Sequence, residues 1–178
     1  MKARVILTLL PAALFVAHVA AQAQVTKDAV PGVTNFARLE TTVACGGATS
    51  PEAMPHLKKM GFKSVINLRV PSEPGADIPT AEAAAKSAGL NYVHLPYAVN
   101  NPDPTLVDRF LAAVTASANQ PAYIHCAGGS RAAGLWMIKR VMVDKWDIQR
   151  ATTEAEALGL SSAPVKKFAL SYIESHKQ

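Results

Sequence analysis

The chain has little that indicates nucleic-acid, nucleotide or metal chemistry. Among its 178 residues there is no run of lysine and arginine and no basic stretch with interleaved aromatics, so we expect no nucleic-acid partner. A Gly-x-Gly-x-x-Gly after a strand and a Walker-type lysine loop are both missing, which argues against nucleotide binding. No group of His, Cys, Asp and Glu has metal-ligand spacing, so we expect neither a metal nor another cofactor. The net charge of +5 favours anionic substrates only slightly.

Long apolar stretches are also scarce, and the one that stands out lies at the N-terminus. Lys2 and Arg4 form a basic start, residues 5–17 are largely apolar, and Ala21-Gln22-Ala23 supplies small residues for cleavage. This pattern predicts a secretory signal peptide over 1–23, because the apolar run is too short for a membrane span; an uncleaved anchor is the alternative. We therefore expect a periplasmic or secreted protein without a membrane span in its mature chain.

The rest of the chain shows strands that alternate with helices. Residues 24–35 have no clear periodicity and predict an extended, partly loose lead-in, and residues 36–178 predict a single domain. Within that domain, strands are predicted over 36–45, 63–68, 90–95 and 121–125, and helices over 51–60, 80–88, 105–118, 131–141, 147–158 and 164–175. This order indicates an α/β fold with a mostly parallel central sheet of four to five strands and helices on both faces. The loops after the strands then meet at one edge of the sheet.

The stretch from Ala122 to Gly134 carries the strongest chemical signal. Its strand, glycine-rich turn and helix start predict Cys126 at the carboxyl end of a strand, facing a helix N-terminus. The helix dipole and nearby N–H groups stabilise a thiolate at such a position, and the same N–H groups form a nest for an anion. Arg131 adds a planar, charged fork for oxyanions. These features indicate attack by Cys126 on a phosphate ester or a related oxyanion.

The segment His125-Cys126, followed by Gly129-Ser130-Arg131, resembles the active loop of the cysteine-dependent tyrosine and dual-specificity phosphatases. That superfamily usually places five residues between Cys and Arg, whereas this chain has four. The shorter loop resembles a bacterial branch, the phosphatase-like domain of beta-lactamase hydrolase-like proteins. Residues 61–69, 92–96 and 154–160 are similar to a second-strand motif, a third strand and a late helix of that branch. The resemblance implies a phosphatase fold and a phosphorylated substrate of a class that the sequence does not name.

The resemblance also implies roles for individual residues. Cys126 would form a phosphocysteine, and Arg131 would bind the phosphoryl oxygens and stabilise the transition state. The loop backbone would bind the same oxygens through Ala127, Gly128, Gly129 and Ser130. The superfamily takes its general acid from a loop in the region of Asp103, which makes Asp103 the candidate acid. Asp103 followed by Pro104 is also a good helix N-cap, and we favour that interpretation.

Four further residues border the predicted site. His125 either fixes the loop, helps to stabilise the thiolate or is a core histidine, and strand alternation directs it away from the nucleophile. Ser130 either hydrogen-bonds the thiolate or caps the helix. Arg69 either shapes the pocket or pairs with Glu73 at the surface. Cys45 either forms a reversible disulfide with the nucleophilic cysteine or both thiols are free.

Two other functions stay open from the sequence. Rhodanese-type sulfurtransferases have a cysteine loop of similarly reduced length that cradles a persulfide, so sulfur transfer through a Cys126 persulfide is the alternative reaction. A non-enzymatic anion-binding or redox-sensing module is the third hypothesis, and a Cys45–Cys126 disulfide would favour it.

Overall fold

The structure, a computed structural model, describes residues 24–176, so the predicted signal peptide over 1–23 lies outside the described residues. A six-stranded sheet runs through this part of the chain in the order β1-β2-β3-β6-β4-β5. Its strands are β1 (Val25–Thr26), β2 (Ala37–Leu39), β3 (Val43–Gly46), β4 (Ser64–Asn67), β5 (Asn91–His94) and β6 (Ala122–His125). The strands β3, β6, β4 and β5 are parallel, whereas β2 pairs antiparallel with both β1 and β3.

The mostly parallel α/β fold predicted from the sequence is confirmed, although the sheet has six strands where four to five were expected. The stretch 36–45, predicted as one strand, contains two strands, β2 and β3, joined by a tight turn. Glu40 adopts a left-handed backbone conformation with φ 46°, and the Thr42 N–H donates to Leu39 O at 3.0 Å. Neither glycine nor proline marks this turn, so the sequence carries no signal for it.

The lead-in over 24–35 is tied to the sheet. β1 pairs with β2 through Val25 opposite Leu39, and Val33 forms an isolated bridge with Thr49. Val30 is buried against the core. The sequence did not predict these pairings, because a two-residue strand and a single bridge leave no periodicity.

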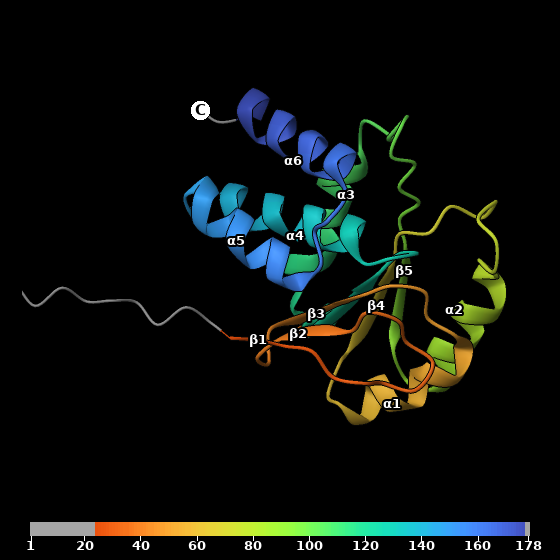
Figure 1. The fold of residues 1–178 in the computed structure, drawn as a ribbon. Helices are drawn as coiled ribbons and strands as arrows, with labels where there is room; N and C mark the ends of the chain where they lie inside the picture. Colours follow the sequence, from red (N-terminus) through yellow and green to blue (C-terminus); the bar gives the residue numbers. More distant parts are fainter. Residues whose placement is uncertain (1–23, 177–178) are drawn as a thin grey trace, which may run out of the picture.

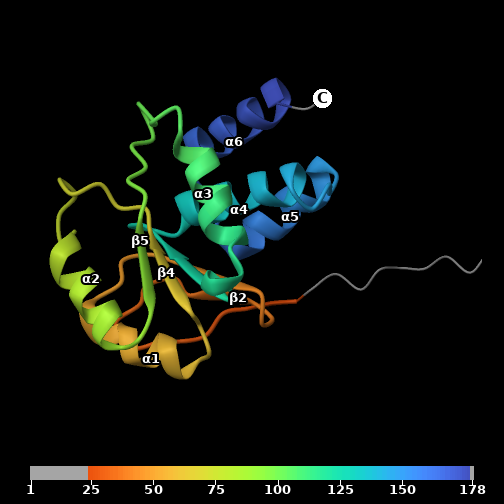
Figure 2. The same cartoon turned by 180° about the vertical axis from the view of Figure 1, so that it is seen from behind.

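Helices cover both faces of the sheet, as predicted (Figure 1). One face carries the 3-10 turn η1 (Pro51–Ala53), α1 (Met54–Lys59) and α2 (Ile78–Ser87). The other face carries α3 (Leu106–Thr115), the turn η2 (Ser117–Asn119), α4 (Ser130–Met142), α5 (Ile148–Leu158) and α6 (Ala163–His176). Figure 2 shows the same two layers from behind. In the described part of the chain, no helix has the length and apolar character needed to cross a membrane.

The central strand β6 is buried over its whole length, which suits a parallel strand covered on both faces. Its side chains alternate between two apolar clusters. Ile124 and Cys126 belong to the cluster that α3, α4, α5 and α6 cover, whereas Tyr123 packs with Phe36 and Phe62 on the face of α1 and α2. The alternation therefore directs Cys126 toward the face that α4 covers.

Candidate active site

The structure places Cys126 between the central strand β6 and the start of α4. Its N–H donates to Gly46 O at 3.2 Å, which extends the pairing of β6 with β3 by one residue. The Gly129 N–H donates to Cys126 Sγ at 3.1 Å, so the loop folds back over the sulfur. Cys126 is only 1 % exposed. An N–H donor this close to a buried sulfur is a contact that supports negative charge on it.

The loop that follows the cysteine is held by neighbouring segments through its carbonyl groups. Ala127 O accepts from the Ala48 N–H at 2.8 Å, and Gly128 O accepts from Asn35 Nδ2 at 3.2 Å. Gly129 has a φ of 102°, a left-handed conformation that favours glycine. Four other N–H groups have no acceptor within residues 24–176, namely those of Ala127, Gly128, Ser130 and Arg131. Such free N–H groups at a helix N-terminus form a nest for an anion.

Arg131, in the first turn of α4, is fixed by contacts with two other loops. Its Nη1 and Nη2 donate to the two carboxylate oxygens of Glu73 at 2.6 and 2.9 Å. Nη1 also donates to Tyr97 O at 2.9 Å and to Leu68 O at 3.3 Å. Burial alone would lower the pKa of Arg131, but Glu73 and the nearby Cys126 sulfur raise it, so the guanidinium stays charged. These bonds do not use the Nε N–H or one N–H of Nη2, which remain available to an anion.

Glu73 connects Arg131 with Arg69 and the loop after β4. From the sequence alone, Glu73 was considered only as a partner of Arg69. Besides the two bonds from Arg131, it accepts from the Val70 N–H at 3.1 Å and from Arg69 Nε at 3.2 Å. Burial alone would raise the pKa of Glu73, but the hydrogen bonds from Arg131 and Val70 and the charge of Arg131 lower it to about 2. The sequence does carry a signal for this role, because Arg69 and Glu73 stand four residues apart where a strand ends.

Arg69 belongs to the same buried network, so its pairing with Glu73 is not the surface ion pair that was one of the two interpretations of the sequence. Arg69 is 7 % exposed. Its Nη1 donates to Gly75 O at 2.9 Å, and its Nη2 donates to Pro74 O. Arg69 therefore shapes the loop after β4 and holds Glu73 in front of Arg131.

His125 lies on the opposite face of β6 from Cys126, as strand alternation predicts. Its ring stacks on Tyr123, with the ring centroids 5.7 Å apart and the planes 6° apart. Burial, with the charge of Arg69, lowers the pKa of His125 to about 3, so the ring is neutral. Within residues 24–176, neither ring nitrogen has a hydrogen-bond partner. A neutral imidazole supplies no positive charge to a thiolate, which corrects that part of the expected role.

Both cysteines are free and buried. In the register of β3 and β6, Cys45 stands opposite Ile124, two residues before Cys126. Strand spacing and rise put the Cα atoms of such a pair about 8 Å apart, beyond the usual range for a disulfide. Burial raises the pKa of the Cys45 thiol, and the charge of Cys126 adds to the effect. Of the two interpretations of the cysteine pair, the structure therefore agrees with two free thiols.

Asp103, the candidate general acid, is bound within its own loop. Its Oδ1 accepts from the Thr105 N–H and from Thr105 Oγ1, both at 2.8 Å, and Oδ2 accepts from Arg109 at 3.3 Å. The Thr105 bonds, with the Arg109 charge, lower the pKa of Asp103. The residue stabilises the turn before α3, close to the N-cap role that the sequence favoured, although the N-cap position itself is Thr105. A carboxylate held in this way is a poor source of a proton.

Ser130 contacts neither the thiolate nor its own helix end. It is the first residue of α4, and its Oγ accepts from the N–H groups of Ser161 and Ser162 at 3.1 and 2.9 Å. The predictions that the Ser130 hydroxyl bonds the thiolate or caps the helix were therefore wrong. The hydroxyl instead connects α4 with the segment between α5 and α6. The Ser130 N–H still faces no acceptor in the described part of the chain.

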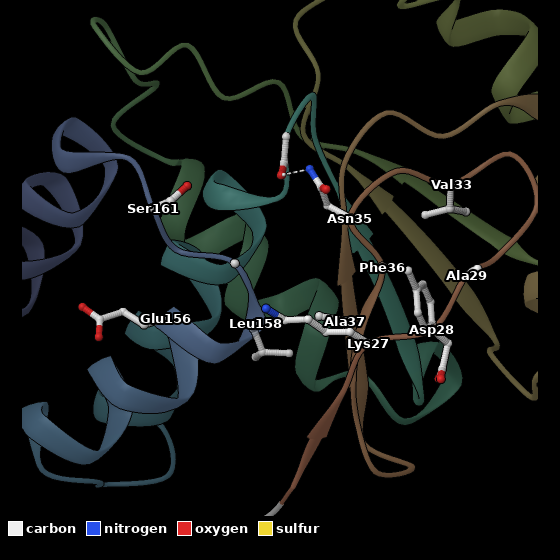
Figure 3. A pocket seen from close by; sticks show the side chains of 12 residues that line it. Lys27, Asp28, Ala29, Val33, Asn35, Phe36, Ala37, Glu156, Leu158 and Ser161 are labelled. Carbon is white, nitrogen blue, oxygen red and sulfur yellow. Dashed lines mark hydrogen bonds between the residues drawn. The ribbon is translucent and has the colours of Figure 1, made fainter.

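A cleft of about 620 Å³ adjoins the loop at Gly128 (Figure 3). It lies between the lead-in with β2 on one side and the end of α5 on the other. Figure 3 shows the Asn35 amide bonded to the loop at the top of the cleft, with Lys27 extending across it. The lining side chains are mixed in character: Lys27, Asp28, Ala29, Val33, Asn35, Phe36, Ala37, Glu156, Leu158 and Ser161. Within residues 24–176, no three His, Cys, Asp or Glu side chains gather closely enough to hold a metal ion.

Comparison with known proteins agrees with this geometry. Residues 35–143 match the family model of the beta-lactamase hydrolase-like protein, phosphatase-like domain. A beta-lactamase hydrolase-like protein of Agrobacterium fabrum is 34 % identical over 120 residues, which cover 66 % of this chain but 27 % of that protein. The chain thus spans about a quarter of the length of this relative.

Solved structures show the same fold at low sequence identity. A DUF442 protein from Shewanella putrefaciens CN-32 superposes with a TM-score of 0.67 at 21 % identity, covering 83 % of this chain and 93 % of the other. A variant of P. aeruginosa TpbA in complex with pTyr superposes with a TM-score of 0.65 at 19 % identity, covering 86 % and 90 %. The family match over most of the domain, together with the shared fold, leads to one conclusion: this chain belongs to the family of phosphatase-like domains of beta-lactamase hydrolase-like proteins.

Proposed function

We propose that this protein is an exported phosphate monoester hydrolase that works through a phosphocysteine. In the first step, a lone pair of the Cys126 thiolate forms a bond to phosphorus, and the P–O bond to the leaving group breaks with its electrons on oxygen. In the second step, water attacks phosphorus, the P–S electrons return to sulfur, and phosphate leaves as H2PO4−. The N–H groups of the loop and the Arg131 guanidinium hold the phosphoryl oxygens in both steps.

The observation that carries the proposal is the 3.1 Å contact between the Gly129 N–H and Cys126 Sγ. It puts the sulfur at the base of a loop whose other N–H groups lack acceptors within residues 24–176. A phosphoryl group bound by those N–H groups has the sulfur close to phosphorus and the charged Arg131 beside it. The pTyr complex of the similar TpbA supports a phosphorylated substrate.

The test is hydrolysis of 4-nitrophenyl phosphate under reducing conditions. We expect Cys126→Ser to lower kcat by at least about 10³-fold, because an alcohol replaces the nucleophilic thiol. Cys45→Ser is the matched control, since it changes the other cysteine outside the loop, and it should keep kcat within about twofold. Turnover retained by Cys126→Ser would contradict the mechanism.

Sulfur transfer is the second candidate, because four residues rather than five separate Cys126 from Arg131. In that reaction, the Cys126 thiolate would attack the outer sulfur of thiosulfate, the S–S bond of thiosulfate would break, and sulfite would leave. The Cys126 persulfide would then transfer its outer sulfur to a nucleophilic acceptor, which returns the Cys126 thiolate. Incubation with thiosulfate and intact-mass measurement of the wild type and Cys126→Ser decides between the two. A persulfide on Cys126 together with no phosphate hydrolysis would make sulfur transfer the function.

Export is proposed from the basic and apolar pattern of residues 1–23 alone. Expression of the full sequence in a Gram-negative host, followed by fractionation and N-terminal sequencing, tests it. A periplasmic protein that begins at Gln24 is the expected result, and an intact N-terminus in the cytoplasmic fraction would contradict it.

A further inference from the structure

Within residues 24–176, the edge of the sheet that forms the anion nest offers no carboxylic acid placed to protonate a leaving group. We infer that this chain hydrolyses phosphates whose leaving oxygen departs as an anion without receiving a proton. Such substrates are aryl phosphates and phosphoanhydrides, whereas alkyl phosphates are hydrolysed much more slowly. The inference rests on the proposed function and names the substrate class of the same site.

Three carboxylates stand on the loops that leave β3, β4, β5 and β6 in the described chain: Glu73, Asp77 and Asp103. Asp103 accepts two bonds from Thr105 and one from Arg109, and its side chain is 44 % exposed. Both of its oxygens therefore hold the turn before α3 in place. Releasing either oxygen toward a substrate would break these contacts.

The other two carboxylates are also occupied. Both oxygens of Glu73 accept from Arg131, so its protonation would remove the clamp on the residue that binds the anion. Asp77 caps α2, because its Oδ1 accepts from the Thr80 N–H at 3.1 Å and its Oδ2 from Thr80 Oγ1 at 2.7 Å. Hydrogen bonds from Thr80 lower the pKa of Asp77, so this group too is ionised at neutral pH.

Other proton donors at this edge do not replace a carboxylic acid. Tyr97 follows β5, and its buried hydroxyl has no hydrogen-bond partner within residues 24–176. Burial raises the pKa of this phenol, so it is a far weaker proton donor than a carboxylic acid. His94 Nε2 lies 2.8 Å from Arg69 O and is engaged there. His125 is fully buried and neutral on the opposite face of β6.

The cleft beside Gly128 contains two more carboxylates, and neither lies against the nest. Glu156 pairs with Lys166 at 2.7 Å. Figure 3 shows the Glu156 carboxylate pointing away from the cleft and Asp28 far below the bond between Asn35 and Gly128. Asp28 is nevertheless the strongest rival as an acid, because the lead-in carries it along one wall of the cleft.

A missing acid changes the first chemical step in a way that can be measured. The Cys126–phosphorus bond forms as the P–O bond breaks, and the leaving oxygen takes the full negative charge before water protonates it. A phenol, with a pKa of about 10, carries that charge far better than an alkyl alcohol does. General acid catalysis is worth about 10² to 10⁴ in rate, and that factor would be missing for a basic leaving group.

The experiment measures kcat/KM of the wild-type protein for a series of substituted phenyl phosphates whose phenols differ in pKa. We expect kcat/KM to fall by about tenfold for each unit by which the phenol pKa rises, because charge on the leaving oxygen is not neutralised in the transition state. Phosphotyrosine and inorganic pyrophosphate distinguish aryl esters from anhydrides, and phosphoserine should be hydrolysed at least about 10²-fold more slowly than phosphotyrosine.

Asp103→Asn and Asp28→Asn are tested on the same series. Asparagine keeps the ability of Asp103 to accept hydrogen bonds in its turn, so the fold is preserved. Neither variant should change kcat/KM or its dependence on the phenol pKa by more than about twofold. A wild type that is insensitive to the phenol pKa, together with a variant that becomes sensitive, would overturn the inference and identify the acid. If the wild type hydrolysed none of the substrates in the series, that result would instead overturn the proposed function itself.

Discussion

The loop after β6 and the loop after β5 border the same edge of the sheet, yet they are built in opposite ways. The first is held by other segments of the chain, since Ala48 and Asn35 bind its carbonyl groups and Glu73 fixes its arginine. The second presents its carboxylate, Asp103, to solvent and satisfies it with two neighbours in its own segment.

The difference separates two tasks that a phosphatase combines. Binding of the phosphoryl group needs fixed N–H donors and a fixed positive charge, and those are in place before a substrate arrives. Proton donation needs a carboxyl group that is protonated near neutral pH, and the described part of the chain has none at this edge. The site is thus built to stabilise the negative charge on the phosphoryl oxygens, and it has no group that neutralises the charge on the leaving oxygen.

The comparison of the two loops predicts the largest loss of kcat/KM for Arg131→Lys. Lysine keeps the positive charge but lacks the fork that contacts both Glu73 and an anion, so kcat/KM should fall by about 10² to 10³. Steady-state hydrolysis of 4-nitrophenyl phosphate measures this. Arg140→Lys on the same helix is the matched control, because Arg140 bonds Glu154 and Asp144 away from the loop. Equal losses in the two variants would show that helix stability rather than the fork is responsible.

A smaller effect is expected from Glu73→Gln. Glutamine keeps the shape of Glu73 but not its charge, so Arg131 loses one ionic contact and samples more orientations. We expect kcat/KM to fall by roughly tenfold, with inhibition by inorganic phosphate weakened in parallel. Glu82→Gln, which removes the partner of Lys86 on the surface of α2, serves as the control and should have no effect on either measurement. A Glu73→Gln variant as active as the wild type would contradict the positioning role.

Glu73→Gln should also change how the free energy of unfolding depends on pH. The pKa of Glu73 is about 2 in the folded state, below its ordinary value of 4.5, so its contribution is present above pH 4.5 and is lost as the pH falls toward 2. Partial exposure of the carboxylate limits that contribution to about 1 kcal/mol. Urea unfolding between pH 2 and 7 measures it. The wild type should lose more stability over this window than Glu73→Gln, and parallel curves would show that Glu73 contributes nothing.

The smallest effect is expected from Asp103→Ala. The variant loses the contacts with Thr105 and Arg109 at an exposed turn, so the protein should become only slightly less stable. Hydrolysis of an activated aryl phosphate should be unchanged, since the side chain is bound outside the nest. Thermal unfolding and kcat/KM, measured on the same preparation, distinguish an effect on stability from an effect on activity. A loss of activity at full stability would return Asp103 to the catalytic machinery.

Local patterns in the sequence were sufficient for the fold class and for the position of Cys126 after the strand β6. The alternation of strands and helices is a property of short windows, so the parallel sheet and its two helical layers were predicted from periodicity. Turns without glycine or proline were missed, as at Glu40, and so was the pairing of the lead-in at Val25. Both depend on contacts that leave no repeating pattern in the chain.

By itself, the sequence determined that a cysteine, a glycine turn and an arginine follow one strand, because Cys126, Gly129 and Arg131 lie within a few consecutive residues. Only the tertiary structure decided which partner the arginine has, since Glu73 lies 58 positions away in the chain. The same holds for Asp103, whose neighbours, and not its residue type, decide whether it is an acid or a turn residue. Hydrogen bonds between distant segments set the protonation and direction of each group, and only the folded chain brings those segments together.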